Sequence, residues 1–335
     1  MQRSLVKDRH LTRLFIILAV AVAALSILKP SVFLSAANFR SMAVQFPELG
    51  FLSIAAALVL MSGGIDLSVT GTAMLSGIVA ALIMQAGGAQ AADVSLGVVA
   101  LACLAALCVG LACGAVNALL VAKVGIAPML VTLGTMNLFT GIGIVLTKGS
   151  ALSGFPEAFL AIGNGLVLGI PVPFLLFVAA IAILAFFLNK TKLGYKLYVY
   201  GSNPVASFFS AVNNTRVVLS TYVLSGFVSA VAGLIMVSRV NTAKADFGSS
   251  YGLQALLVAV LGGINPSGGS GKAIGIFLSI VTLQVLSSGF NLLHVSSFLK
   301  DLTWGALLVF VMVLNTLGPK LKHKKAAPPA KEQKS

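Results

Sequence analysis

The stretch "FLSIAAALVLMSGGIDLSVTG", residues 51–71, decides the fold, because an apolar run is stopped there by paired glycines and followed by Asp66. The run from Phe51 to Met61 is shorter than the roughly 17 residues that a helix needs to cross a bilayer. Pro47 and Glu48 stand upstream, where the run would have to continue to reach that length. Backbone that is not helical at membrane depth is tolerated only inside protein or beside an aqueous cavity. The stretch therefore predicts a broken or short helix beside a polar pathway.

A second copy of this pattern, "YGLQALLVAVLGGIN", occupies residues 251–265. Each copy starts with an aromatic residue, and the copies stay in step apart from one extra residue, Ser62, so Asp66 corresponds to Asn265. Paired interruptions in two halves of a membrane protein point to a transport pathway. We expect two repeats, at roughly residues 42–147 and 217–317, within one transmembrane domain, residues 1–318.

The composition fixes the class of protein. Hydrophobic residues make up 58% of the 335 residues, charged residues make up 9%, and the mean hydropathy is +1.04. No polar shell could cover so much apolar surface, which excludes a water-soluble globule. The apolar runs are continuous, whereas the strands of a membrane β-barrel alternate. The sequence predicts an all-α polytopic membrane protein with about ten transmembrane helices.

The basic residues predict the orientation. With ten spans and both termini in the cytoplasm, 16 of the 22 Lys and Arg lie on the cytoplasmic side, in agreement with the positive-inside rule. We interpret residues 319–335 as a basic, disordered cytoplasmic tail. The net charge of +14 then reflects topology and contact with membrane lipid, and we expect no nucleic-acid partner.

Asp66 has two interpretations. It could line the pathway, or it could cap the helix that begins near Leu67 by accepting backbone N–H bonds. Asn265 could cap equally well. Most other acids and all three histidines stand outside the span centres, so the chain of titratable groups that a proton relay needs is missing.

The motif "GGINPSGGSGKA", residues 262–273, resembles a phosphate loop but lacks its first glycine, because Pro266 stands there, and has Ala273 after Lys272 where Ser or Thr would bind magnesium. We therefore expect no ATPase site and no enzymatic activity in this chain. The three cysteines fall on different faces of one helix, so no metal site is expected either.

The longest polar interval between spans, residues 189–216, contains a short segment with an apolar face. Such a face outside the bilayer predicts docking into the groove of a partner. The alternative is that the segment lies on the protein's own surface or at the membrane interface. The candidate docking residues are Asn203, Pro204, Val205, Phe208, Phe209 and Val212.

Five pieces of sequence, in this order and spacing, resemble the membrane subunits of ribose-type ABC importers, which handle monosaccharides and autoinducer-2. These are "GGIDLSV" (63–69), "VTLGTMNLFTG" (131–141), "YGSNPVA" (200–206), "YVLSGFVSAVAGLI" (222–235) and "VLGGINPSGGSGKAIG" (260–275). The resemblance covers the length of the chain. Three sets of positions depart from the family pattern, namely Thr70, the pair Thr140 and Tyr195, and the pair Gly252 and Gln254.

The resemblance implies two inverted repeats, similar to the cobalamin-importer permease, and a coupling helix at residues 203–212. It also implies a bacterial inner-membrane location and three kinds of partner: a second permease, identical or homologous, cytoplasmic ATPases that bind ATP and Mg, and a periplasmic or lipid-anchored solute-binding protein. No cofactor is expected in this chain. The solute would be a small hydrophilic molecule, a monosaccharide or a sugar-derived signal.

Polar or aromatic residues at the spans supply the candidates for the solute pathway. Buried amides are costly unless they are paired, so each could meet solute hydroxyls or brace helices. The candidates are Phe51, Asp66, Asn137, Tyr251, Asn265 and Asn291. An ion-gradient-driven secondary transporter is the alternative function, and a passive channel is a third.

Overall fold

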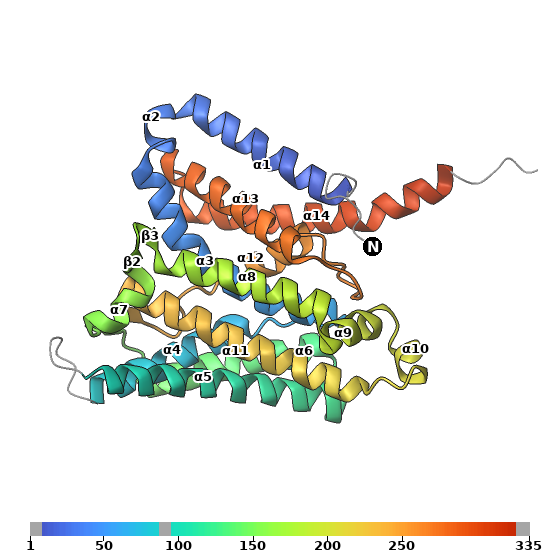
Figure 1. The fold of residues 1–335 in the computed structure, drawn as a ribbon, viewed down its shortest axis with the longest axis horizontal. Coiled ribbons are helices and arrows are strands. Elements are labelled where there is room, and N and C mark those ends of the chain that lie inside the picture. Colours follow the sequence, from blue (N-terminus) through green and yellow to red (C-terminus); the bar gives the residue numbers. More distant parts are fainter. Residues whose placement is uncertain (1–8, 87–94, 326–335) are drawn as a thin grey trace, which may run out of the picture.

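The structure is a computed structural model that describes residues 9–86 and 95–325, and helices form most of this part of the chain (Figure 1). The helices are α1 (Arg9–Leu28), α2 (Pro30–Phe33), α3 (Ala36–Met61), α4 (Val69–Ala86), α5 (Leu96–Leu119), the π-helical turn η2 (Leu120–Val124), α6 (Pro128–Thr147), α7 (Glu157–Asn164), α8 (Val172–Lys190), α9 (Lys192–Ser202), α10 (Pro204–Phe209), α11 (Asn214–Val240), α12 (Tyr251–Leu261), α13 (Ala273–Leu292) and α14 (Ser297–Lys325).

Two short antiparallel strand pairs complete the described structure. Strand β1 (Leu152–Ser153) pairs with β4 (Thr242–Ala243), with Leu152 opposite Ala243. Strand β2 (Leu166–Val167) pairs with β3 (Ile170–Pro171) in a tight hairpin. Both strand pairs stabilise loops that connect helices.

Eight helices within the described residues are long and apolar enough to cross a membrane, judged by length and composition: α1, α3, α4, α5 with η2, α6, α8, α11 and α13. The chain is therefore an all-α polytopic membrane protein, as its composition predicted. The total of about ten crossings, the boundaries of the two inverted repeats and the likeness to the cobalamin-importer permease stay predictions.

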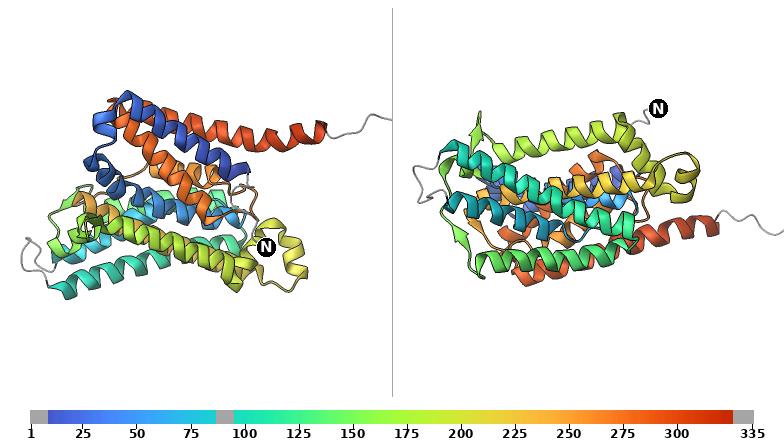
Figure 2. Two further views of the ribbon diagram at one scale, coloured as in Figure 1. Left: turned by 45° about the horizontal axis from the view of Figure 1, so that its top comes forward. Right: turned by 90° about the horizontal axis from the view of Figure 1, so that it is seen from below.

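The long helices run along one axis, so the bundle has two distinct ends (Figure 1). Helices α9 and α10 lie at one end, which we call the α10 end, and α2 and α7 lie at the other, which we call the opposite end. The loop 262–272 also belongs to the α10 end, because the Tyr198 hydroxyl of α9 donates a 2.7 Å hydrogen bond to the Gly271 carbonyl. The turned views in Figure 2 show the same separation.

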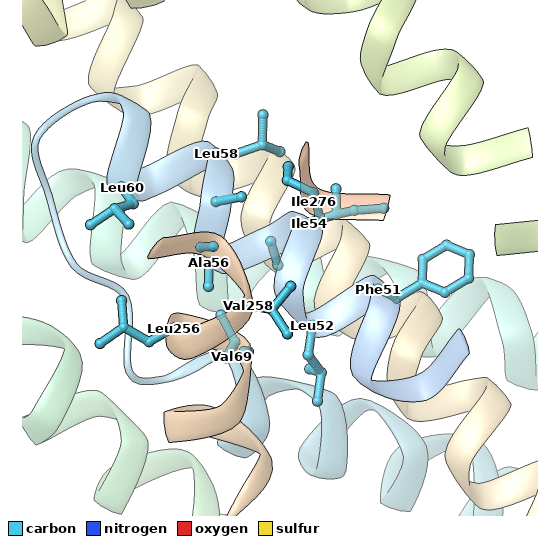
Figure 3. Packing of buried hydrophobic residues seen from close by; sticks show 14 of the residues in the cluster. Phe51, Leu52, Ile54, Ala56, Leu58, Leu60, Val69, Leu256, Val258 and Ile276 are labelled. Carbon is cyan, nitrogen blue, oxygen red and sulfur yellow. The ribbon is translucent and has the colours of Figure 1, made fainter. Parts of the chain in front are cut away.

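Helix α3 forms the centre of the hydrophobic core. All residues from Phe46 to Met61 are buried, as expected for a helix that is apolar on every face. It packs against α8, α11, α12 and α13. Leu52 and Ala56 of α3 meet Val258 of α12 in this core (Figure 3). The two segments that the sequence pairs as repeats therefore pack against each other.

The first predicted helix break is absent. Helix α3 runs without interruption from Ala36 through Pro47 to Met61, which is 26 residues, so Phe51 lies inside a full-length helix rather than at the start of a short one. The sequence interpretation was wrong here because a proline removes only one N–H donor, and neighbouring helices can stabilise the helix that contains it. The second predicted short helix is confirmed, since α12 has 11 residues.

Helices α3 and α12 end with the same hydrogen-bonded cap, a Schellman motif. Gly63 and Gly263 follow their helix ends with φ values of 81° and 83°. The next amide donates to Val59 O at 3.2 Å in the first copy and to Ala259 O at 3.1 Å in the second. The extra residue of the first copy therefore lies after this cap, and Ser62, which the sequence comparison had taken as the insertion, matches Gly262.

Helix α11 lies so close to its neighbours that two of its positions require glycine. A Cβ atom on Gly226 would overlap the carbonyl oxygen of Gly110 in α5, and a Cβ on Gly233 would overlap the carbonyl oxygen of Ala73 in α4. Small residues at such crossings let helix backbones approach each other, as is common in membrane bundles.

The first seven residues of the expected tail, 319–325, are helical. Helix α14 continues to Lys325, and residues 326–335 of the expected disordered tail lie outside the described residues.

Candidate functional site

Helix α10 is a separate short helix between α9 and α11, and its sequence explains where it starts. The Asn203 side-chain oxygen accepts hydrogen bonds from the amides of Val205 and Ala206, both at 3.0 Å. Pro204 occupies the first helical position, where its missing N–H costs nothing. Asn203 is thus the N-cap of α10, in agreement with the role of asparagine at helix starts.

The apolar face of α10 points away from the bundle. Val205, Phe208 and Phe209 are 65%, 69% and 82% exposed, and the two rings meet edge to face with centroids 5.9 Å apart. Val212, which the sequence assigned to the same face, is instead buried in the main core. The reason is that α10 ends at Phe209, so the helical spacing does not extend to Val212.

Helix α10 is fixed to the bundle by a side-chain link to α11. Asn214 in the first turn of α11 donates from Nδ2 to the Pro204 carbonyl at 2.8 Å and accepts from the buried Ser207 hydroxyl at 2.8 Å. These two hydrogen bonds connect α10 directly to the start of α11.

A buried polar network surrounds Asp66. One carboxylate oxygen accepts from the Ser68 amide at 2.9 Å and the Ser68 hydroxyl at 2.6 Å, and the other accepts from the Ser225 hydroxyl at 2.9 Å. Asn117 donates to the Ser68 hydroxyl, and Thr135 donates to Asn117, each at 2.7 Å. The network joins the start of α4 to α5, α6 and α11.

Asn265, the repeat partner of Asp66, makes an equivalent local turn. Its side-chain oxygen accepts from the Ser267 amide at 3.0 Å, as Asp66 does from Ser68, two residues further on. Asn265 is exposed, however, whereas Asp66 is buried. Both side chains accept a hydrogen bond from a backbone amide two residues further on. Of the two, only Asp66 also takes part in the hydrogen bonds that join helices in the described residues.

A polar pocket of about 200 Å³ lies between α4, α6 and the loop before α12. Asn137 of α6 is exposed there, and its amide nitrogen donates to the Leu133 carbonyl at 3.2 Å. Lys244 hydrogen-bonds Asp246 at 2.9 Å and lowers the pKa of that carboxyl, which stays ionised at neutral pH. The pocket is lined by Thr70, Gly71, Met136, Asn137, Thr140, Ala245, Asp246, Phe247 and Ser249.

A buried ion pair was missed by the sequence analysis. The Glu48 carboxylate of α3 has no exposed surface and forms a two-point pair with the Arg239 guanidinium of α11, with Nη2 3.1 Å from Oε2. The Tyr251 hydroxyl of α12 interacts with the same carboxylate. The signal that could have revealed the pair is an arginine at the end of one apolar run and an unmatched acid inside another.

Comparison with known proteins identifies the chain's family. The family model described as "Branched-chain amino acid transport system / permease component" matches residues 38–312. The chain belongs to this permease family. The match confirms the ribose-type ABC importer permease relationship that the five sequence motifs indicated.

Curated relatives of the permease agree with this assignment. It is 36% identical over 303 residues to the ribose import permease protein RbsC of Bacillus subtilis (strain 168), covering 90% of this chain and 91% of that protein. It is 32% identical to the autoinducer 2 import system permease protein LsrD of Photorhabdus temperata and of Escherichia coli (strain K12), over 80% of this chain and 80% and 81% of those proteins. No solved structure matched the permease.

The six pathway candidates of the permease do not meet at one place. Asn137 lines the polar pocket, whereas Phe51 is buried 6.2 Å from Phe177, ring centroid to ring centroid. Asn265 lies in the loop 262–272 at the α10 end. Asn291, in the last turn of α13, accepts a 2.5 Å hydrogen bond from Lys300. Sequence position alone could not separate these environments, because tertiary packing creates them.

Two departures from the family pattern meet at the polar pocket of the permease. Thr70 and Thr140 both line it beside Asn137. Positions in the lining of a pocket that differ from the family pattern are expected to influence which solute the pocket binds.

Proposed function

We propose that this permease is the membrane subunit of an ATP-driven importer of a monosaccharide or a sugar-derived signal. The proposal is supported by the family and by relatives whose names specify import of ribose and of autoinducer 2. The α10 end would face the cytoplasm of a bacterium and the opposite end the periplasm, since more of the exposed lysines in the described residues lie at the α10 end. They are Lys123, Lys190, Lys192, Lys196 and Lys272, against Lys29, Lys148 and Lys244 at the opposite end. Both termini would then be cytoplasmic.

One observation carries the proposal, namely the exposed phenylalanine pair on the capped helix α10. Phe208 and Phe209 are held outside the apolar bundle by a helix that side chains fix at its start and at Ser207. Burying one phenylalanine is worth roughly 1.5–3 kcal/mol, enough to decide an association. The proposed occupant is a cytoplasmic ATPase subunit that binds ATP and Mg, and docking there would pass its motion through Asn214 to α11.

The polar pocket between α4 and α6 is the proposed contact for the solute. Amide and hydroxyl groups of Asn137, Thr70 and Thr140 suit the hydroxyls of a sugar, because each can donate or accept. Asp66 would not contact the solute in this account, since three hydrogen bonds already occupy its carboxylate. We propose that it holds α4, α6 and α11 in register next to the pocket.

The remaining partners follow from the same architecture. A second permease, identical or homologous, would close the pathway on the exposed side of α6, and a periplasmic or lipid-anchored binding protein would deliver the solute. We assign no cofactor to the chain itself.

The alternative, a secondary transporter driven by an ion gradient, needs a route for the coupling ion. The buried acids among the described residues are Glu48 and Asp66. The part of α3 between them is roughly 20 Å long at 1.5 Å per residue. Glu48 is also neutralised by Arg239. Two buried acids at this separation do not form a continuous route for a coupling ion, which favours coupling through a partner ATPase.

The test is the double substitution Phe208→Ser and Phe209→Ser. We expect a folded, inserted protein that no longer copurifies with its ATPase and no longer transports. Phe298→Ser is the matched control, because Phe298 is 87% exposed at the start of α14 and lies at the opposite end. If the double variant binds its ATPase and transports at the original rate, α10 is only a surface helix.

A further inference from the structure

An apolar groove runs along the outside of the bundle between α8 and α11, with α3 as its floor. Both helices pack on α3, and the space between them has a volume of about 340 Å³. The lining is hydrophobic throughout and includes Ile54 and Leu58 of α3, Ile183 and Phe187 of α8, and Leu224 and Val231 of α11. In Figure 1, α8 and α11 lie on the near side of the bundle, with α3 between and behind them.

The groove opens toward the hydrocarbon of the membrane. Ile183 and Phe227 on its two walls are 67% and 37% exposed, and all three bordering helices are long and apolar enough to span. A volume in this range is typical of sites for small ligands. A water-filled groove with this lining would leave large apolar surfaces wet, so its occupant must be hydrophobic.

Positive charge marks the α10 end of the groove. Ile183, Phe187 and Lys190 follow one another at i, i+4 and i+7 on α8, so Lys190 lies on the groove face one turn beyond the last lining residue. Lys192 and Lys196 on α9 follow it, and all three lysines are exposed. No acidic side chain in the described part of the chain pairs with them.

Helix α9 lies at the α10 end of the groove and has features of a helix at the membrane interface. It packs against both α8 and α11, and its Tyr200 packs against the buried cluster that contains Val218 and Tyr222 of α11. Its Tyr195 is 68% exposed beside the lysines. Tyrosine and lysine together are typical of the level of lipid headgroups.

From these features we propose that the groove between α8 and α11 binds one anionic phospholipid of the leaflet at the α10 end. An acyl chain would lie along Ile54 and Leu58, and Lys190, with Lys192 and Lys196 beside it, would hold the phosphate. Because the surrounding bilayer also offers hydrocarbon, selectivity comes from the headgroup. The bound lipid would fix α8 relative to α11, and α8 leads directly into α9 and α10.

The experiment is native mass spectrometry of the purified, delipidated permease. Phosphatidylglycerol and phosphatidylcholine with the same acyl chains are added in equal amounts. We expect one phosphatidylglycerol to be retained in preference to phosphatidylcholine. Lys190→Gln should lower that preference about fivefold, the effect of removing one lysine from the headgroup level. Lys123→Gln, an exposed lysine of η2, is the matched control and should leave the preference unchanged.

A second variant tests the groove itself. Ala180→Trp fills it, because Ala180 lines the α8 wall, and should reduce retention of both lipids; Ala112→Trp on the exposed side of α5 should not. Inorganic phosphate should not compete, since it lacks the acyl chain. Equal retention of the two lipids by the unmodified permease, or equal effects of Lys190→Gln and Lys123→Gln, would overturn the proposal. So would a change of oligomeric mass in place of lipid loss in Ala180→Trp, because the groove would then hold a second copy.

Discussion

The buried pair of Glu48 and Arg239 offers a quantitative test of the packing between α3 and α11. Arg239→Gln leaves the Glu48 carboxylate with no exposed surface and no cation. Removing one partner of a buried pair costs about 3–5 kcal/mol. Glu48→Gln should cost less, roughly 1–2 kcal/mol, because the Arg239 side chain is 22% exposed and its charged end can turn toward water.

The double variant Glu48→Gln, Arg239→Gln measures how much of these costs comes from the interaction between the two side chains. With both charges removed, two amides can hydrogen-bond in their place, so the total cost should be about 2–3 kcal/mol, less than the sum of the single costs. Unfolding in mixed micelles with increasing dodecyl sulfate provides the free energies. The reporter is Trp304, the chain's single tryptophan, which is 7% exposed and 5.5 Å from Phe290 between ring centroids.

A surface ion pair serves as the control. Lys244 and Asp246 are 50% and 60% exposed, so Lys244→Gln should change the free energy of unfolding by less than about 1 kcal/mol. The reasoning fails if the costs of Glu48→Gln and Arg239→Gln add to that of the double variant within about 0.5 kcal/mol, because independent sites behave in that way.

Three further predictions concern packing, capping and solute contact. Gly226→Leu should prevent stable folding, because its side chain would overlap α5. Gly134→Leu should be tolerated, because a Cβ atom at Gly134 has no neighbour within 4 Å. Detergent size-exclusion profiles of the two variants would show the difference. Asn203→Ala should destabilise α10 by about 1 kcal/mol and weaken ATPase association about fivefold in pull-down titrations; unchanged association would exclude a role for the cap. Asn137→Ala should raise the solute concentration for half-maximal uptake, and normal uptake with unchanged affinity would remove Asn137 from the pathway.

The sequence predicts best what composition and local chemistry determine. Apolar runs of spanning length were sufficient to identify a helical membrane protein. The Asn203 and Pro204 start signal located α10 correctly. Paired glycines after two apolar runs located the equivalent caps of α3 and α12. Each of these features depends on residues close together in the chain.

What could not be predicted depends on contacts between distant segments. Glu48 and Arg239 are 191 positions apart, so neither residue reveals the other without the packing of α11 on α3. Val212 joins the core because the chain turns after Phe209, which the periodicity did not show. The pathway candidates separated for the same reason, since only the fold places Asn137 beside Thr70 and buries Phe51 against the ring of Phe177.

The central claim is that transport by this chain is driven by a partner ATPase docked on α10. The most direct measurement is uptake of a radiolabelled monosaccharide, with ribose as the first probe, into proteoliposomes that contain the permease, its copurified ATPase and the solute-binding protein, with ATP on the ATPase side. We predict uptake that requires both ATP and the ATPase, persists with a protonophore, and is lost in the Phe208→Ser, Phe209→Ser variant. Uptake that continues without the ATPase and collapses with the protonophore would contradict the account.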